Sequence, residues 1–367
     1  MKVPFVDLKA QYYSIKNNID KAIAEVIENT AFIKGKYVDE FETNYKKEYG
    51  TDYCIGVANG TDALYIALNA LGIGKGDEVI TTAYSWISTS ETISQTGAKP
   101  VFVDIDPDYY TIDVNKIEEK ITPKTKAILP VHFYGQMADI VKIKEITDKH
   151  KLLLIEDCAQ SHFSEYHGIR AGVTGNAATF SFYPGKNLGA YGDAGAIITN
   201  DEALAIKMRM FANHGSLKKH NHQIEGINSR LDGLQAAILS AKLPYIHEWN
   251  DKRIKNAQIY HHFLHGIPEI KTPATIEGAR HIFHVYCVRA EKRNELIKFL
   301  SENGIDTAIH YPTALPNMPA YKYLGYKPEN FPVATLYQDV ILSLPMYPEL
   351  TLEQIEYVAT KIKEFYS

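Results

Sequence analysis

The sequence predicts a large α/β domain followed by a smaller α+β domain. Between residues 50 and 200, short apolar runs such as AILPV and LLLIE alternate with helical patterns. Such runs are typical of strands covered on both faces, as in a parallel sheet. From Ser229 the pattern becomes helical, and after His265 the sequence changes character, which places a domain boundary near residue 245. We therefore expect a large domain over residues 1–245 and a small C-terminal domain over residues 246–367.

The large domain is expected to hold a doubly wound sheet. Its predicted strands, each a short apolar or β-branched run, are Tyr53–Val57, Glu78–Thr82, Lys99–Val103, Ala127–Val131, Leu152–Glu156, Ala178–Phe182 and Ala194–Thr199. Helical segments lie between them, the clearest being Asp62–Leu71 and Ile140–His150. Strands that alternate with helices in this way favour βαβ units.

The helical pattern then lengthens over Ser229–Leu264, where Pro244 should kink or split the helix because proline has no backbone N–H. In the C-terminal domain we expect a strand at His281–Arg289 and helices at Lys292–Asn303 and Thr351–Phe365.

Composition excludes several classes of protein. The chain has 39 Lys and Arg against 44 Asp and Glu, a net charge of -5, which gives no basic excess for binding nucleic acid. We find no signal peptide and no run of 18 apolar residues, so we expect a cytoplasmic protein with no membrane partner. The three cysteines stand far apart, which argues against a disulfide scaffold.

A first candidate site is Asn59-Gly60-Thr61-Asp62, where a predicted strand gives way to a helix. The free backbone N–H groups of a helix start can bind a phosphate, and the Thr61 hydroxyl adds a donor. The alternative is plain helix capping by Thr61 or Asp62.

A second candidate is Asp157, which follows the strand-like run LLLIE. Ligands of open α/β folds bind at the carboxyl ends of the strands, where a carboxylate can pair with a ring nitrogen or a metal. A helix cap or a core salt bridge would explain it equally well. Gln160 and His162 follow within one turn and are expected to face the same cavity.

Two further candidates are Lys186, in the Gly-flanked loop YPGKNLG, and the segment Asn228–Asp232 before a helix. Alone, the lysine would be a solvated charge and the segment a helix cap. Together with the first two sites they supply the groups that pyridoxal phosphate requires. A lysine forms its Schiff base, an acidic group keeps its pyridine nitrogen protonated, and a helix N-terminus holds its phosphate.

At this point the chain resembles the DegT/DnrJ/EryC1/StrS group of nucleotide-sugar aminotransferases, which have the type I aminotransferase fold. The resemblance covers nearly the whole chain. Its markers are VPFVDLKAQY, VANGTDAL, GDEVITTAYSWIST, AKPVFVDID, LPVHFYGQMADI, IEDCAQSHF, FSFYPGKNLGAYGDAGAI, NHG, NSRLDGLQAAIL and IHYP. It implies a mixed, mostly parallel seven-stranded sheet between helices in the large domain.

The resemblance also implies roles for individual residues. Lys186 would carry the pyridoxal 5'-phosphate, which becomes pyridoxamine 5'-phosphate during turnover, and Asp157 would pair with its ring nitrogen. The other implied cofactor contacts are Gly60, Thr61 and Ser181 at the phosphate, Gln160 at the phenolic oxygen, Trp86 on the ring, and Asn228 from a neighbouring subunit. The active site would then be shared across a homodimer, and His162 beside the cofactor would contact the sugar or position a water.

The implied substrates are L-glutamate and a dTDP-3-oxo-6-deoxyhexose of gluco or galacto configuration. Expected substrate contacts are Tyr12, Lys36, Tyr183, Lys219, Arg230, His310 and Tyr311. Amination of a dTDP-4-oxo-6-deoxyhexose at C-4 is an alternative, and so is a regulator or partner-binding protein without catalysis. A metal site is not expected, because His281 and His284 in HxxH would point to opposite faces of a strand.

Overall fold

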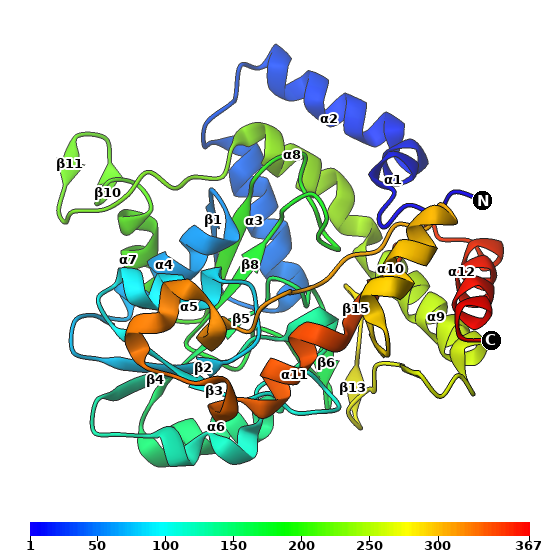
Figure 1. Ribbon diagram of the computed structural model, residues 1–367. Coiled ribbons are helices and arrows are strands. Elements are labelled where there is room, and N and C mark those ends of the chain that lie inside the picture. Colours follow the sequence, from blue (N-terminus) through cyan, green and yellow to red (C-terminus); the bar gives the residue numbers. More distant parts are fainter.

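The computed structural model describes residues 1–367, and a seven-stranded sheet forms its centre (Figure 1). In spatial order the strands are β1 (Tyr53–Val57), β9 (Gly195–Thr199), β8 (Ala177–Ser181), β5 (Leu153–Asp157), β4 (Thr125–Leu129), β2 (Glu78–Thr82) and β3 (Lys99–Val103). Only β9 runs against the others. The expected mixed, mostly parallel sheet is confirmed.

Helices cover both faces of this sheet because its side chains alternate between two cores. Ile80, Ile128 and Leu154 point into a core that also holds residues of α2 (Lys16–Glu28), α3 (Lys36–Tyr49), α6 (Ile140–His150) and α8 (Gly233–Lys242). Their strand neighbours Val79 and Ile155 point into the opposite core, with residues of α4 (Gly60–Ala70), α5 (Ser88–Gln95) and α7 (Glu202–Phe211).

The C-terminal part has its own small sheet and core. The sheet has the order β12 (Ile270–Lys271), β14 (Tyr286–Ala290) and β15 (Ile341–Leu344). The core is built around this sheet by α9 (Ile246–Leu264), α10 (Arg293–Glu302) and α12 (Leu352–Tyr366). A further core joins this part to the large sheet, and α11 (Pro332–Val340) contributes to it. The division at residues 245 and 246 stays a prediction.

The start of the chain belongs to this C-terminal core. Val3 is fully buried there and forms a parallel bridge with Ile305. The Val3 N–H donates to the carbonyl of Gly304 at 2.9 Å. Phe5 then stacks on the His310 ring, with 5.5 Å between ring centroids, and α1 (Leu8–Ser14) follows. Figure 1 shows the N-terminus beside α10 and α12.

Two small elements lie outside these layers. The hairpin of β10 (Ser216–Lys218) and β11 (Asn221–His222) projects from the body of the molecule (Figure 1). A small sheet of β13 (Ala279–Arg280), β6 (Glu165–Tyr166) and β7 (Ile169–Arg170) packs beside the C-terminal part. None of the helices has both the length and the apolar character needed to cross a bilayer.

Most predicted elements appear within two residues of their expected bounds. Pro244 splits the long helix into α8 and α9 through a short 3-10 turn at Leu243–Tyr245, as predicted. The strand predicted at His281–Arg289 is wrong in its first half, because β14 begins only at Tyr286. Phe283 has a φ of 44°, and this left-handed residue cannot belong to a strand.

Candidate active site

A cavity of about 580 Å³ opens at the carboxyl ends of the sheet strands, where open α/β folds bind ligands. Asn59 and Gly60 follow β1, Ser85 and Trp86 follow β2, and Asp157 and Ser181 end β5 and β8. The cavity collects ten of the predicted site residues, namely Gly60, Thr61, Trp86, Asp157, Gln160, Ser181, Tyr183, Lys186, His310 and Tyr311.

One end of the cavity is the N-terminus of α4. Asn59 caps this helix, since its side-chain oxygen accepts the N–H of Asp62 at 2.7 Å. The N–H groups of Gly60 and Thr61 have no partner in the chain. A Cβ on Gly60 would lie 2.7 Å from the Cβ of Ser181, so only glycine allows this approach. The helix start can therefore be capped and still offer donors to an anion.

Asp157 is a carboxylate that is 4% exposed at the floor of the cavity. Its Oδ2 accepts the Thr89 hydroxyl at 2.9 Å, and its Oδ1 accepts the N–H of Ala159 at 3.1 Å. Burial raises the pKa of this carboxyl despite these hydrogen bonds. A cationic N–H placed beside it would relieve that cost.

Lys186 is the amine of the cavity. It follows a turn in which its N–H donates to the carbonyl of Tyr183 at 2.8 Å. Its Nζ makes no hydrogen bond within the chain. Burial lowers the pKa of Lys186 to about 8, against the opposing charge of Asp157. An amine with this pKa is partly neutral near physiological pH, as a nucleophile requires.

Aromatic and amide side chains complete the walls. Gln160 accepts the N–H of Tyr134 at 2.8 Å and donates to the Tyr311 hydroxyl at 3.3 Å, which fixes its amide. The Trp86 ring lies 5.3 Å from that of Tyr311. Trp86 is 56% exposed and Tyr183 60% exposed, so both present their rings at an open part of the cavity.

These features fit pyridoxal 5'-phosphate. The free N–H groups of Gly60 and Thr61, with the Ser181 hydroxyl, suit its phosphate. The buried Asp157 has no positively charged hydrogen-bond partner and suits a protonated ring nitrogen, while the unpaired Nζ of Lys186 suits its aldehyde.

The chain matches the DegT/DnrJ/EryC1/StrS aminotransferase family over residues 13–363. It belongs to that family. It is an aminotransferase, and its cofactor is pyridoxal 5'-phosphate.

Relatives of this aminotransferase match it over the full length. A "pleiotropic regulatory protein" of Geobacillus stearothermophilus is 48% identical, over 100% of this chain and 99% of the relative. The "dTDP-3-amino-3,6-dideoxy-alpha-D-galactopyranose transaminase" of Aneurinibacillus thermoaerophilus is 43% identical, over 99% of both chains. The crystal structure of DesV from S. venezuelae with a ketimine intermediate is 41% identical and has a TM-score of 0.97, over 100% of this chain and 99% of that one. The type I aminotransferase fold is thereby confirmed.

His162 does not lie where it was expected. It is fully buried outside the cavity, stacked against the rings of Phe180 and Phe182. Its Nε2 donates to the Ser181 carbonyl at 2.9 Å, which leaves Nδ1 to accept the Tyr45 hydroxyl at 3.1 Å. Burial lowers the pKa of His162 to about 3. The expectation that His162 faces the cavity is therefore wrong, and the ring instead holds the backbone of Ser181.

Five other predicted residues lie outside the cavity of this chain. Lys36, Lys219 and Asn228 are exposed, and Tyr12 is half-buried with its hydroxyl donating to Asp20 at 2.7 Å. Arg230 lines a separate hollow of about 200 Å³ near the ion pair of Arg209 and Glu42.

Several residues of the site are not indicated by the sequence, and three of them bear directly on its chemistry. Thr89 bonds Asp157, Ser88 bonds the Thr61 hydroxyl at 2.7 Å, and His284 lines the cavity. The segment AYSWISTS, which holds Ser88 and Thr89, could have signalled a hydroxyl-rich helix start after a strand. His284 lies in the segment that the sequence predicts as a strand, and no signal in the sequence points to its position in the cavity.

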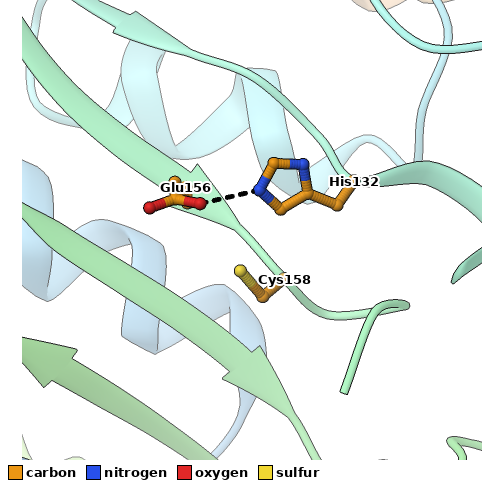
Figure 2. Close-up of side chains that lie close together, drawn as sticks. All are labelled: His132, Glu156 and Cys158. Carbon is orange, nitrogen blue, oxygen red and sulfur yellow. Dashed lines mark hydrogen bonds and ion pairs between the residues drawn. The ribbon is translucent and has the colours of Figure 1, made fainter. Parts of the chain in front are cut away.

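Behind Asp157, on the opposite side of β5, lies a buried cluster of His132, Glu156 and Cys158 (Figure 2). His132 donates from Nε2 to Glu156 at 2.8 Å and accepts the N–H of Ala138 at Nδ1. Burial opposes ionisation of Glu156, but this bond and the N–H groups of Gly172, Thr174 and Gly175 hold its pKa below the ordinary value. His132 and Glu156 thus form a buried hydrogen-bond network that anchors the strand bearing Asp157, with the Cys158 thiol beside it.

Proposed function

We propose that this aminotransferase moves the amino group of L-glutamate to C-3 of a dTDP-3-oxo-6-deoxyhexose, of gluco or galacto configuration. The product would be a dTDP-3-amino-3,6-dideoxyhexose. The coarser statement, transamination of a nucleotide-linked ketosugar, is supported by the unpaired Lys186 Nζ beside Asp157 in an open cavity. The name of the A. thermoaerophilus relative supports C-3 and dTDP.

The chain's own residues divide the work of the reaction. Pyridoxal phosphate, when bound, supplies a ring that accepts electrons from the carbon being deprotonated. Asp157 would hold the proton on the ring nitrogen, and Thr89 would keep that carboxylate oriented. The Lys186 amine would take the proton from one carbon and return it to another, since one partly neutral lysine can be base and then acid.

We further propose that the site is completed by a second copy of the chain. Asn228 is exposed, so it is free to reach the phosphate of a neighbouring subunit. Lys219 lies between the strands of the projecting hairpin, where its charge is free for a nucleotide phosphate. We propose Tyr12 and Lys36 as further contacts to the nucleotide, and Arg230 as a contact to the glutamate carboxylate.

The test is incubation of the holoenzyme with L-glutamate and, in separate reactions, dTDP-linked 3-oxo and 4-oxo sugars and a UDP-linked 3-oxo sugar. Products are identified by mass spectrometry and NMR. Amination at C-3 of a dTDP sugar, with ping-pong kinetics, is expected. Amination only at C-4, or only of the UDP sugar, would refute this substrate.

A regulatory role is the second candidate, because a relative that is 48% identical carries the name of a regulatory protein. Retention of Lys186 and Asp157 in the cavity argues for catalysis. A holoenzyme that keeps its visible absorption band in the presence of L-glutamate would favour the regulatory role.

A further inference from the structure

His284 presents one side of its ring to the active-site cavity. It precedes β14 in the C-terminal part of the chain, and Val285 and Lys186 line the same cavity. It is half-buried, and its Nε2 is not among the fully buried polar atoms that lack a partner. The carbonyl groups of Phe283 and His284 both accept the buried guanidinium of Arg253 at 3.3 Å, so the backbone at this point is fixed.

A chain of amides determines which nitrogen of His284 carries the proton. The carbonyl of His162 can only accept, so the amide nitrogen of Asn250 points at it, at 2.9 Å. Asn250 then offers its oxygen to the amide nitrogen of Asn187, at 2.8 Å. Asn187 in turn offers its oxygen to Nδ1 of His284, at 3.0 Å. Nδ1 must therefore be the N–H of the ring.

The other nitrogen is left as an acceptor without a partner. Nε2 of His284 has no hydrogen bond within the chain. Burial, and then the positive charge of Lys186, hold the pKa of His284 well below its ordinary value. The ring is thus neutral, with a lone pair available on the cavity side.

We propose that Nε2 of His284 accepts a hydrogen bond from a sugar hydroxyl adjacent to the carbon that is aminated. This inference rests on the proposed sugar transamination. The His284 ring is held near the reacting carbon through Asn187, which bonds it at Nδ1. Asn187 is the residue after Lys186, and the Lys186 amine must reach that carbon.

The chemistry of the acceptor selects among the possible ligands. The carboxylates of glutamate and the phosphates of the nucleotide have no proton to donate, and a lone pair repels them. The amino group of glutamate is itself the group transferred. A hydroxyl beside the reacting carbon is the donor that remains, and a site built to accept it discriminates against an analogue that lacks it.

The test separates the two half-reactions of the holoenzyme. L-Glutamate bleaches the visible cofactor band, and the ketosugar restores it, so both rates are read from absorbance. In H284N the shorter amide can keep the contact with Asn187 but not the acceptor at Nε2. We expect kcat/KM of the sugar half-reaction to fall about 10- to 100-fold. The fall in the glutamate half-reaction should be at least ten times smaller than that.

Two further variants serve as controls for H284N. H284Q can place its amide oxygen near the Nε2 position and should recover part of the lost rate. H265N makes the same change at an exposed histidine at the end of α9 and should match the wild type. Equal losses in both half-reactions of H284N would overturn the proposal, because they would mean that His284 acts only by positioning Lys186 through Asn187. No loss in either would overturn it too.

Deoxy substrates test the hydroxyl directly, using the wild-type protein. A ketosugar that lacks the hydroxyl at C-2 or at C-4 should react as slowly with the wild type as the full sugar does with H284N. The same analogue should lose nothing further in H284N. If, for both analogues, H284N reduced the rate by the same factor as it does for the full sugar, the proposal would be overturned. A wild type that glutamate bleaches but no ketosugar restores would instead refute the proposed function, and this inference with it.

Discussion

Two lysines of this aminotransferase have pKa values that burial lowers to the same extent, yet their surroundings differ. Burial lowers the pKa of Lys186 and of Lys242 to about 8. Lys242, at the end of α8, is fully buried and donates to the carbonyl of Gly189 at 2.7 Å and to Gln11 at 3.1 Å. Its Nζ also lies 4.2 Å from the centroid of the Tyr191 ring.

The difference between them lies in what each amine touches. Every face of the Lys242 amine meets the protein, so this residue ties the loop after Lys186 to helix α1. The Lys186 amine has no hydrogen bond and faces a cavity. A lowered pKa therefore marks a buried lysine, and only the open cavity with Asp157 marks a reactive one.

The largest effect is expected at Lys186. K186A removes the group that moves the proton and should lower turnover about 10⁴-fold. The visible band of the bound cofactor should disappear with it. K242M, the matched change at the other buried lysine, should keep that band. A K242M protein that folds but has lost the band would break the distinction between the two lysines.

D157N should have the next largest effect. The amide cannot balance a positive charge on the ring nitrogen, so we expect kcat to fall about 10²- to 10³-fold while the cofactor still binds. Steady-state kinetics and a cofactor titration measure the two effects separately. A kcat within three-fold of the wild type would show that this carboxylate is not needed beside Lys186.

Lys242 should make the free energy of unfolding depend on pH. Its pKa is about 8 when folded and 10.5 in the unfolded chain, so the unfolded state binds more protons between these values. Stability from this group therefore rises with pH over that window, by up to about 3 kcal/mol. The free energy of unfolding of the wild type, minus that of K242M, should increase accordingly from pH 8 to pH 10.5. Denaturant titrations of the apoenzyme measure it, and a flat difference would contradict the shift.

The smallest effect is expected at Thr89. T89V removes the hydroxyl that bonds Asp157 while keeping the shape of the side chain, and should lower kcat about five-fold. T92V is the control in the same helix, since the Thr92 hydroxyl bonds only backbone carbonyls. Equal effects of the two changes would mean that the helix, and not the contact to Asp157, is responsible.

Sequence alone located the parts of the site that sit at strand ends. Gly60, Asp157 and Lys186 follow predicted strands, and strands fix where their carboxyl ends meet. Ser181 was expected only from the family resemblance. His162 was misplaced because the chain turns between Asp157 and Ser164, and this turn buries the ring behind Ser181. Its distance in sequence from Asp157 could not reveal that.

The fold was predictable for a similar reason. Apolar runs identified β1, β2 and β3 with their observed bounds, because buried parallel strands need continuous apolar sequence. The start of β14 was not predictable, since the left-handed Phe283 is set by packing against the segment around Gly135. Residues that a second subunit would place, such as Asn228, stay predictions.

The position of Val3 and Phe5 has a consequence for synthesis of the protein. Val3 pairs with Ile305, and Phe5 lines the cavity while it stacks on His310. Val3 and Phe5 leave the ribosome before these partners, which are made more than 300 residues later. The active-site wall therefore closes only after nearly all of the chain has been translated.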